Sequence, residues 1–300
     1  MYKIGIPRSL FYYYYIDIWT NFFDYLKIPY IISPKTNEDI IKRGIKVSFD
    51  EMCYALKTYL GHVDYLKDKC DYILIPRIDN YKLDNQTCTN FLSAYDIVKN
   101  TFNCNILSYN INLDKNETLK KGLLKMGKKL KKTKSEISKA YKFAIDKYNE
   151  KQVSEISNNM NKLNSKKTKI LIISHPYNIY DGLIGSSIIK YLENNDIAVI
   201  YSDKFDSKKM NKLSKEISKD LYFKYSKENI GSLIFSFDKI DGVIFLSAFP
   251  CGPDSLANEL AFRKIDIPYI NLIIDNNQTF TAVETRLESF IDILKGGLND

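Results

Sequence analysis

Apolar, β-branched residues gather in eight short runs along the chain, and these runs form two sets of four. Continuous apolar runs of this length are typical of strands that are buried on both faces of a parallel sheet. Segments with helical spacing separate the runs, so strand and helix alternate in each half. The predicted strands are 2–6, 28–32, 71–75 and 104–108 in the first set and 169–174, 197–201, 242–247 and 268–274 in the second.

The predicted strands of the two sets have similar spacing along the chain. Successive strands start 26, 43 and 33 residues apart in the first set and 28, 45 and 26 apart in the second. We therefore predict an α/β fold of two flavodoxin-like or Rossmann-like lobes with parallel sheets, related by approximate internal duplication. The predicted organisation is an N-terminal lobe at 1–112, a long basic helical linker at 113–168 and a C-terminal lobe at 169–300.

Aromatic residues crowd the segment after the first predicted strand, where Tyr12 to Tyr15 form an unbroken run. The run resembles a cofactor-binding box at first sight. With Ile18, Trp19 and Phe22, however, the residues recur at helical spacing. The pattern predicts a helix that packs an aromatic face into the core.

Positive charge is concentrated in the middle of the chain. The formal net charge is +8, and residues 112–170 alone hold 17 lysines against 6 acidic residues. Residues 119–152 show apolar positions at helical spacing with lysines on the other faces, which predicts one long amphipathic helix. A solvated helix joining the lobes is the preferred interpretation over nucleic-acid binding, since no nucleic-acid motif accompanies the charge. A basic docking surface for an acidic partner or a phosphate-bearing substrate stays open.

The bulk composition excludes several classes of protein. Hydrophobic residues make up 45% of the 300 positions, which is ordinary for a globular chain. No apolar run approaches the ~20 residues of a membrane span, and the first ten residues do not resemble a secretory signal. We therefore expect a cytoplasmic protein without membrane contact. Five scattered cysteines make a poor disulfide framework, so metal ligation or burial is expected for them.

The carboxyl ends of parallel strands are where open α/β sheets bind ligands. Cys88 follows the third predicted strand of the first lobe in a polar loop, and Cys251 follows the third predicted strand of the second lobe. If the lobes face each other, these loops meet in a cleft. Cys251 precedes Gly252 and a proline suited to the first turn of a helix, whose dipole would stabilise a thiolate. Gly252 would let backbone N–H groups approach a sulfur.

The other cysteines carry weaker signals. Cys53 lies at the start of a helical pattern and is ambiguous on its own. Cys70 and Cys104 fall at the amino ends of predicted strands, away from the expected cleft, and are interpreted as structural. The chain has no CxxC motif, so neither zinc-ribbon nor ferredoxin spacing is present.

One further loop carries candidate catalytic residues. His175, Tyr180 and Asp181 follow the first strand of the second predicted lobe, where the histidine could relay a proton or simply bond a backbone carbonyl. Arg8 and Ser9 occupy the matching loop of the first lobe and could contact an anion or cap a helix. His62 lies in a helical pattern and is interpreted as structural.

Several segments together resemble a known family. The segments DEMC, HPYNIYD and CGPDSL and the C-terminal TRLESF helix are similar to those of the 2-hydroxyacyl-CoA dehydratase-related proteins. That group includes the dehydratase subunits, the double-cubane-cluster reductases and the cluster-binding region of some CoA-enzyme activases. The resemblance covers nearly the whole chain except the basic middle segment. The stretch IDNNQTFTAVETRL departs from the more acidic, glycine-bearing sequence of many relatives, which bears on substrate contacts.

The resemblance implies a cofactor and a chemistry. It places the ligands of one [4Fe–4S] cluster on Cys53, Cys88 and Cys251, with one iron open to a substrate oxygen, a water or a bridging sulfide. In the dehydratases, an ATP-hydrolysing activator injects a low-potential electron, and an acyl-CoA carbonyl is reduced so that a hydroxyl can leave. This chain has no GxxxxGK[ST] phosphate loop, so a separate partner would hydrolyse ATP. The expectation is a homo- or heterodimer that acts on acyl-CoA or another small molecule.

Two alternatives stay open beside this iron–sulfur dehydratase or reductase. The chain could be a non-catalytic redox-sensing or regulatory module in which the cluster is structural. The three cysteines with His175 could instead hold zinc.

Overall fold

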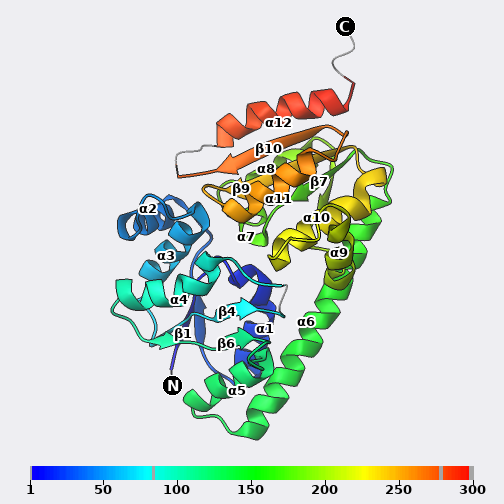
Figure 1. The fold of residues 1–300 in the computed structure, drawn as a ribbon. Coiled ribbons are helices and arrows are strands. Elements are labelled where there is room, and N and C mark those ends of the chain that lie inside the picture. Colours follow the sequence, from blue (N-terminus) through cyan, green and yellow to red (C-terminus); the bar gives the residue numbers. More distant parts are fainter. Residues whose placement is uncertain (1, 83–84, 277–279, 297–300) are drawn as a thin grey trace. The chain divides into compact units, whose positions relative to one another are not determined.

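The computed structural model describes residues 2–82, 85–276 and 280–296 (Figure 1). The chain divides into two compact units, residues 1–152 and 153–300. The division falls inside the segment 113–168 that the sequence assigns to a linker. No helix in the described ranges combines the length and the apolar character needed to cross a membrane.

The first unit is built on a parallel four-stranded sheet in the order β2-β1-β3-β5. Ile4 pairs with Tyr30 on one side and with Tyr72 on the other, so β1 lies at the centre. All three residues of β1 are buried, as the sequence pattern requires. The strands are β1 (Ile4–Ile6), β2 (Tyr30–Ile32), β3 (Tyr72–Leu74) and β5 (Ile106–Leu107), and the helices that connect them are α1 (Tyr12–Tyr25), α2 (Glu38–Val47), α3 (Tyr54–Leu66) and α4 (Thr89–Thr101).

The second unit repeats this plan with the sheet β10-β9-β7-β8. Leu171 pairs with Ile200 and with Val243, which places β7 between β8 and β9. The strands are β7 (Lys169–Ile173), β8 (Ala198–Tyr201), β9 (Gly242–Ala248) and β10 (Tyr269–Ile274). The helices are α7 (Pro176–Ile179), α8 (Gly185–Asn194), α9 (Ser207–Leu213), α10 (Lys224–Ser236), α11 (Gly252–Phe262) and α12 (Phe280–Leu294), with 3₁₀ turns η1 (Ser214–Glu216) and η2 (Phe237–Lys239).

Both sheets therefore place their strands in the spatial order second, first, third, fourth. This is the flavodoxin-like arrangement, and it confirms the predicted α/β fold with parallel sheets. All eight predicted strands are present: β9 extends one residue beyond its prediction, to Ala248, and the other seven are each at most three residues shorter than predicted.

Equivalent hydrogen bonds confirm the internal duplication. Asp71 accepts from the backbone N–H of Lys3, and Asp241 accepts from that of Lys169, both at 2.7 Å. Each aspartate precedes the third strand of its unit, and each lysine precedes or begins the first. The carboxyl edges also match: the Ser33 hydroxyl accepts from the N–H of Arg8, and the Ser202 hydroxyl accepts from that of Ser174.

A glycine at the same helix position in each unit allows close helix packing. Gly61 and Gly231 are each the eighth residue of a 13-residue helix, α3 and α10. A Cβ on Gly61 would lie 2.0 Å from the carbonyl oxygen of Ile40, and one on Gly231 would lie 2.0 Å from that of Met210. Glycine is required at both positions because a neighbouring backbone occupies the space of a side chain.

The aromatic segment forms α1, and its predicted core-facing role is confirmed. Tyr15, Trp19, Phe22 and Phe23 are buried in the first unit. The indole N–H of Trp19 donates to the hydroxyl of Tyr109 over 2.8 Å, which satisfies both polar atoms in a buried position.

The single long basic helix predicted for residues 119–152 is wrong. The structure has two helices, α5 (Leu119–Lys129) and α6 (Lys134–Leu163). Lys131 adopts a left-handed conformation with φ of 62°, which ends the first helix. Thr133 and Glu136 then form a reciprocal capping box, in which the N–H of Thr133 donates to Glu136 and the N–H of Glu136 donates to the Thr133 hydroxyl.

A small second sheet in the first unit has no counterpart in the sequence prediction. It pairs β4 (Arg77–Asn80) with β6 (Asn110–Asn112) in parallel. These strands extend the carboxyl side of β3 and β5, so they carry the chain from the main sheet toward α4 and α5.

Candidate functional site

Each of the three cysteines that the sequence singles out stands immediately before a helix. Cys53 precedes α3, Cys88 precedes α4 and Cys251 precedes α11, and all three have extended backbone conformations. None of the three sulfurs caps its own helix. The unsatisfied N–H groups and the positive dipole end of a helix favour a thiolate at such a position.

Within the first unit, Cys53 and the start of α4 are in contact. The side-chain amide of Asn90, the second residue of α4, donates to the Cys53 sulfur over 3.2 Å. Because Cys88 precedes this helix directly, the helix starts that carry Cys53 and Cys88 lie next to each other. Cys53 is buried and Cys88 is partly exposed.

In the second unit, Cys251 lies at the carboxyl edge of the sheet, after β9. The Ser255 hydroxyl and the Ser255 N–H both donate to the carbonyl oxygen of Cys251, which fixes the first turn of α11. A Cβ built on Gly252 meets no described atom within 4 Å. Neither packing among the described residues nor a left-handed conformation therefore requires a glycine there, and the position leaves room for an approaching group.

The two cysteines interpreted as structural have a different environment. The Cys70 thiol donates to the carbonyl oxygen of Leu66 over 3.3 Å, and a Cβ on Gly5 would lie 2.5 Å from its sulfur. Burial raises the pKa of Cys70 to about 11 and also raises the pKa of Cys104. Both groups stay protonated at neutral pH, which suits packing and disfavours metal ligation.

His175 is buried at the end of β7 and is held from three sides. Its Nε2 lies 3.1 Å from Oδ1 of Asp254, the third residue of α11. Its ring stacks on Tyr177 at 4.8 Å and meets the edge of Tyr225 at 5.7 Å. The other Asp254 oxygen, Oδ2, is buried and finds no hydrogen-bond partner in the described part of the chain. The two side chains therefore form a fixed hydrogen-bonded pair, and Asp254 lies three residues after Cys251 in the chain.

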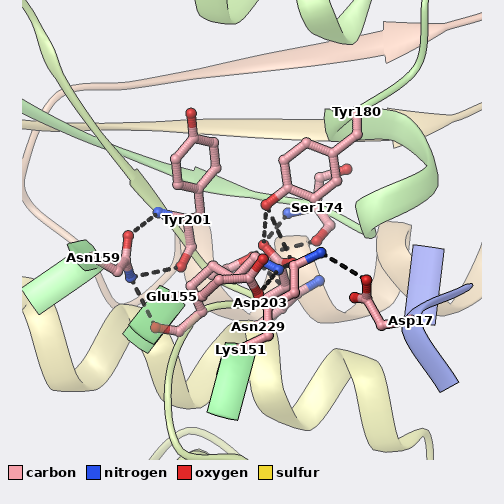
Figure 2. A network of polar contacts seen from close by, with 11 residues as sticks. Asp17, Lys151, Glu155, Asn159, Ser174, Tyr180, Tyr201, Asp203 and Asn229 are labelled. Carbon is pink, nitrogen blue, oxygen red and sulfur yellow. Dashed lines mark hydrogen bonds and ion pairs between the residues drawn. The ribbon is translucent and has the colours of Figure 1, made fainter. Parts of the chain in front are cut away.

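Tyr180 belongs to a buried network of charges (Figure 2). Its hydroxyl donates to both carboxylate oxygens of Asp203, at 3.2 and 3.3 Å. Lys204 lies 3.3 Å from Asp203 and 2.7 Å from Glu155 of α6. Burial, reinforced by the charge of Asp203, raises the pKa of Tyr180 well above its ordinary value. Tyr180 is therefore a neutral hydrogen-bond donor at physiological pH.

Asp181 has a structural arrangement around its carboxylate. One oxygen accepts from the N–H groups of Leu183 and Ile184, at 2.8 and 3.1 Å. The carboxylate thereby fixes the turn that leads into α8, and its side chain is buried. Catalytic roles for His175, Tyr180 and Asp181 stay predictions, and His175 contacts Asp254 of the helix that follows Cys251.

The matching loop of the first unit contains Arg8. Its backbone N–H and its guanidinium bind the hydroxyl and the carbonyl oxygen of Ser33, and its guanidinium lies over the ring of Tyr12. Ser9 is buried. His62 is fully buried beside the Thr36 hydroxyl, and burial, with the nearby charge of Arg8, lowers its pKa to about 3. A neutral, buried His62 fits the structural interpretation.

The donor set suits an iron–sulfur cluster in its chemistry. Three thiols lie at helix starts, one of them already accepts an N–H···S hydrogen bond, and a glycine leaves space beside a second. Within residues 2–82, 85–276 and 280–296, however, no group of three or more His, Cys, Asp and Glu side chains could hold a metal ion. Ligation by Cys53, Cys88 and Cys251 therefore stays a prediction, as does the zinc alternative.

A known protein family matches more than half of the chain. The family model described as the CoA enzyme activase uncharacterised domain (DUF2229) matches residues 3–205. The chain belongs to this family. The match covers the first unit from residue 3 onward and the part of the second that carries β7, α7, α8 and β8, including His175, Tyr180 and Asp181.

The other comparisons add no functional information. No curated protein matches the chain. Among solved structures, a sugar transporter from Clostridium phytofermentans is similar over 98% of this chain and 93% of that chain, with 11% identity and a TM-score of 0.20. Similarity at this level bears on neither fold nor function.

Sequence reasoning missed the partners that define these environments. These partners are Asn90 for Cys53, Asp254 for His175 and Lys204 for Asp203. The first two of these pairs are 37 and 79 residues apart in the chain. Asp254 lies in the CGPDSL segment that the resemblance quoted, which is the one available signal for it.

Proposed function

We propose that this member of the CoA enzyme activase domain family binds one [4Fe–4S] cluster through Cys53, Cys88 and Cys251 and serves low-potential electron transfer or reductive chemistry. The observation that carries the proposal is the shared position of the three cysteines, each at the start of a helix on the carboxyl side of a flavodoxin-like sheet. When bound, the cluster would supply a one-electron reductant with an iron open to a substrate.

The chain's own residues would tune that chemistry. The helix starts at Cys53, Cys88 and Cys251 offer partial positive charge to thiolates. The Asn90 amide donates to the Cys53 sulfur and stabilises added negative charge there. The buried His175–Asp254 pair holds a proton at Nε2 or at a carboxylate oxygen near Cys251, where a leaving group needs one.

The family match and the lack of a phosphate-loop motif in this sequence support a proposal about partners. A separate ATP-hydrolysing protein would deliver the electron, and an enzyme or an acyl-CoA would receive it. Dimerisation with a second copy or a related subunit is part of the proposal.

Cluster content is the direct test. Anaerobically reconstituted protein is expected to be brown and to contain about four irons and four sulfides per chain. Replacing Cys53, Cys88 or Cys251 by alanine should remove most of the iron. Cys70→Ala and Cys104→Ala are the matched controls and should retain it. Full iron content in all three cysteine variants, or zinc in place of iron, would refute the proposal.

Once iron has been found in the protein, two further measurements distinguish an enzymatic role from a regulatory one. Reductant-driven turnover of acyl-CoA substrates with an ATP-dependent electron donor indicates an enzyme. A cluster whose oxidation changes partner affinity, without turnover, indicates a redox-sensing module.

A further inference from the structure

A cavity of about 590 Å³ lies in the first unit, and its lining residues include none of the cysteines. It opens where Arg77 follows β3, where Ser108 follows β5, and along the first two turns of α5. This is the carboxyl side of the main sheet, the side on which open α/β sheets bind ligands. Its volume is in the range of sites for small molecules.

Four cationic side chains line this cavity: Arg77, Lys115, Lys121 and Lys125. Glu117 is the acidic residue that lines it. Arg77 is paired with Asp96, and the Lys125 ammonium lies 4.0 Å from Glu117. Lys115 and Lys121 have no ion-pair partner among the described residues, and the Lys121 ammonium donates to the carbonyl oxygen of Asn116, at 3.0 Å. The wall therefore carries about two positive charges that the protein does not neutralise.

A close contact between α5 and the segment that contains Tyr109 and Asn110 brings these cations together. Lys121, Gly122 and Lys125 share one face of α5. A Cβ on Gly122 would lie 2.9 Å from the Tyr109 ring and 3.2 Å from the carbonyl oxygen of Asn110. Glycine at this position thus lets α5 approach the strand region closely, which holds both lysines at the cavity wall. Arg77 reaches the same space from β4 and lies 5.4 Å above the Tyr95 ring.

We propose that this cavity binds the pyrophosphate group of a phosphorylated small molecule. Two uncompensated ammonium groups, beside the guanidinium of Arg77 that Asp96 already pairs, match a compact anion with two or more negative charges. The cavity is larger than pyrophosphate itself, and Tyr95 and Tyr109 are also among its lining residues, so an organic part is accommodated beside the anion. The charge of the basic middle segment, which the cluster proposal does not use, is in part explained by this site.

The proposal does not rest on the iron–sulfur cluster, because every lining residue belongs to the first unit. Calorimetric titration of the 300-residue chain with ADP, coenzyme A and inorganic pyrophosphate tests it, with cluster-free and reconstituted protein side by side. Binding in both preparations, weakened by added salt, is expected. Tighter binding of ADP identifies a free nucleotide as the ligand source, and tighter binding of coenzyme A identifies the coenzyme.

Charge-reversal variants locate the site. Lys115→Glu and Lys121→Glu should each weaken binding at least about ten-fold, since each replaces an attraction by a repulsion. Lys128→Glu is the matched control, an exposed lysine of the same helix outside the cavity, and should bind as the unmodified chain does. The milder Lys121→Gln variant should also weaken binding. An unchanged melting temperature of this variant would show that the weaker binding does not come from a folding defect.

Three results would overturn the inference. One is the absence of binding of all three ligands at millimolar concentration. Another is equal affinity in the charge-reversal variants and the control. The third is a single-stranded oligonucleotide that binds more tightly than the small molecules and whose affinity falls equally in Lys128→Glu, which would indicate a surface for nucleic acid.

Discussion

The side-chain amide of Asn90 donates a hydrogen bond to the sulfur of Cys53, with 3.2 Å between the two atoms. Asn90 follows Cys88 by two residues, so one hydrogen bond couples the helix start at Cys88 to the thiol at the start of α3. A short polar side chain in the first turn of α4 thereby acts on a sulfur that precedes another helix.

Asn90→Ala should lower the reduction potential of the reconstituted cluster. An N–H···S hydrogen bond stabilises the more negative, reduced state, so its loss should cost about 1 kcal/mol, or roughly 40 mV for one electron. Redox titration monitored by EPR measures the shift. Asn100→Ala is the control, because the Asn100 amide bonds a backbone carbonyl in the same helix. An unchanged potential with full iron content would show that this hydrogen bond does not reach a cluster ligand.

The buried histidine of the first unit makes stability depend on pH. Burial lowers the pKa of His62 to about 3 in the folded chain, whereas an unfolded histidine titrates near its ordinary value of 6.5. The folded state therefore excludes a proton that the unfolded state takes up. Stability should be complete above about pH 6.5 and should fall by up to about 1.4 kcal/mol per pH unit as the pH drops toward 4.

Denaturant unfolding at several pH values tests this dependence. The His62→Gln variant lacks the titrating group and should show a flatter profile between pH 6.5 and 5, above most carboxylate titrations. Parallel profiles for the variant and the unmodified chain would contradict a neutral, buried His62.

Gly61→Ala should destabilise the first unit strongly. The added Cβ would lie 2.0 Å from the carbonyl oxygen of Ile40, so α2 and α3 must separate. We expect a loss of about 2–4 kcal/mol in unfolding free energy. Lys42→Ala, an exposed change on α2, should cost less than about 0.5 kcal/mol. Thermal unfolding followed by circular dichroism compares the two, and similar melting temperatures would refute the tight crossing.

Lys204→Met should destabilise the second unit by about 3–5 kcal/mol, because it removes the cation that Asp203 and Glu155 share in a buried network. The double variant Lys204→Met/Asp203→Asn should recover part of this loss, since one buried negative charge is removed as well. Lys167→Met, which breaks only an exposed pair with Asp196, should cost less than about 1 kcal/mol. Additive losses in the double variant would argue against coupling.

The sheets were predictable because their central strands are buried on both faces. The strand β9 is buried at every position, so it consists almost wholly of apolar residues. Such apolar runs are easy to recognise in a sequence. The sequences of β4 and β6, RIDN and NIN, are polar and short, so nothing local marks them as strands. The break between α5 and α6 did have a signal in Thr133 and Glu136, but the continuing lysine pattern obscured it.

The site was predictable only in part. A cysteine before Gly252 and Pro253 indicates a helix start, and the structure places Cys251 there. Cys88 was expected in a polar loop, and that loop ends at the first turn of α4. The contacts of Asn90 with Cys53 and of Asp254 with His175 join residues far apart in the chain, and no local pattern specifies such pairs.

The matched helices of the two units allow their thiols to be compared position by position. Cys88 and Cys251 are counterparts, since each introduces the helix after the third main strand of its unit. Cys53 has a different counterpart: α10 agrees with α3 in its lysine at the fourth residue and its glycine at the eighth, and the residue that introduces α10 is Phe223. A fully symmetric precursor would have had four sulfurs. The ring of Phe223 stands at the position of the fourth, so a cluster bound as proposed would keep one iron without a protein ligand.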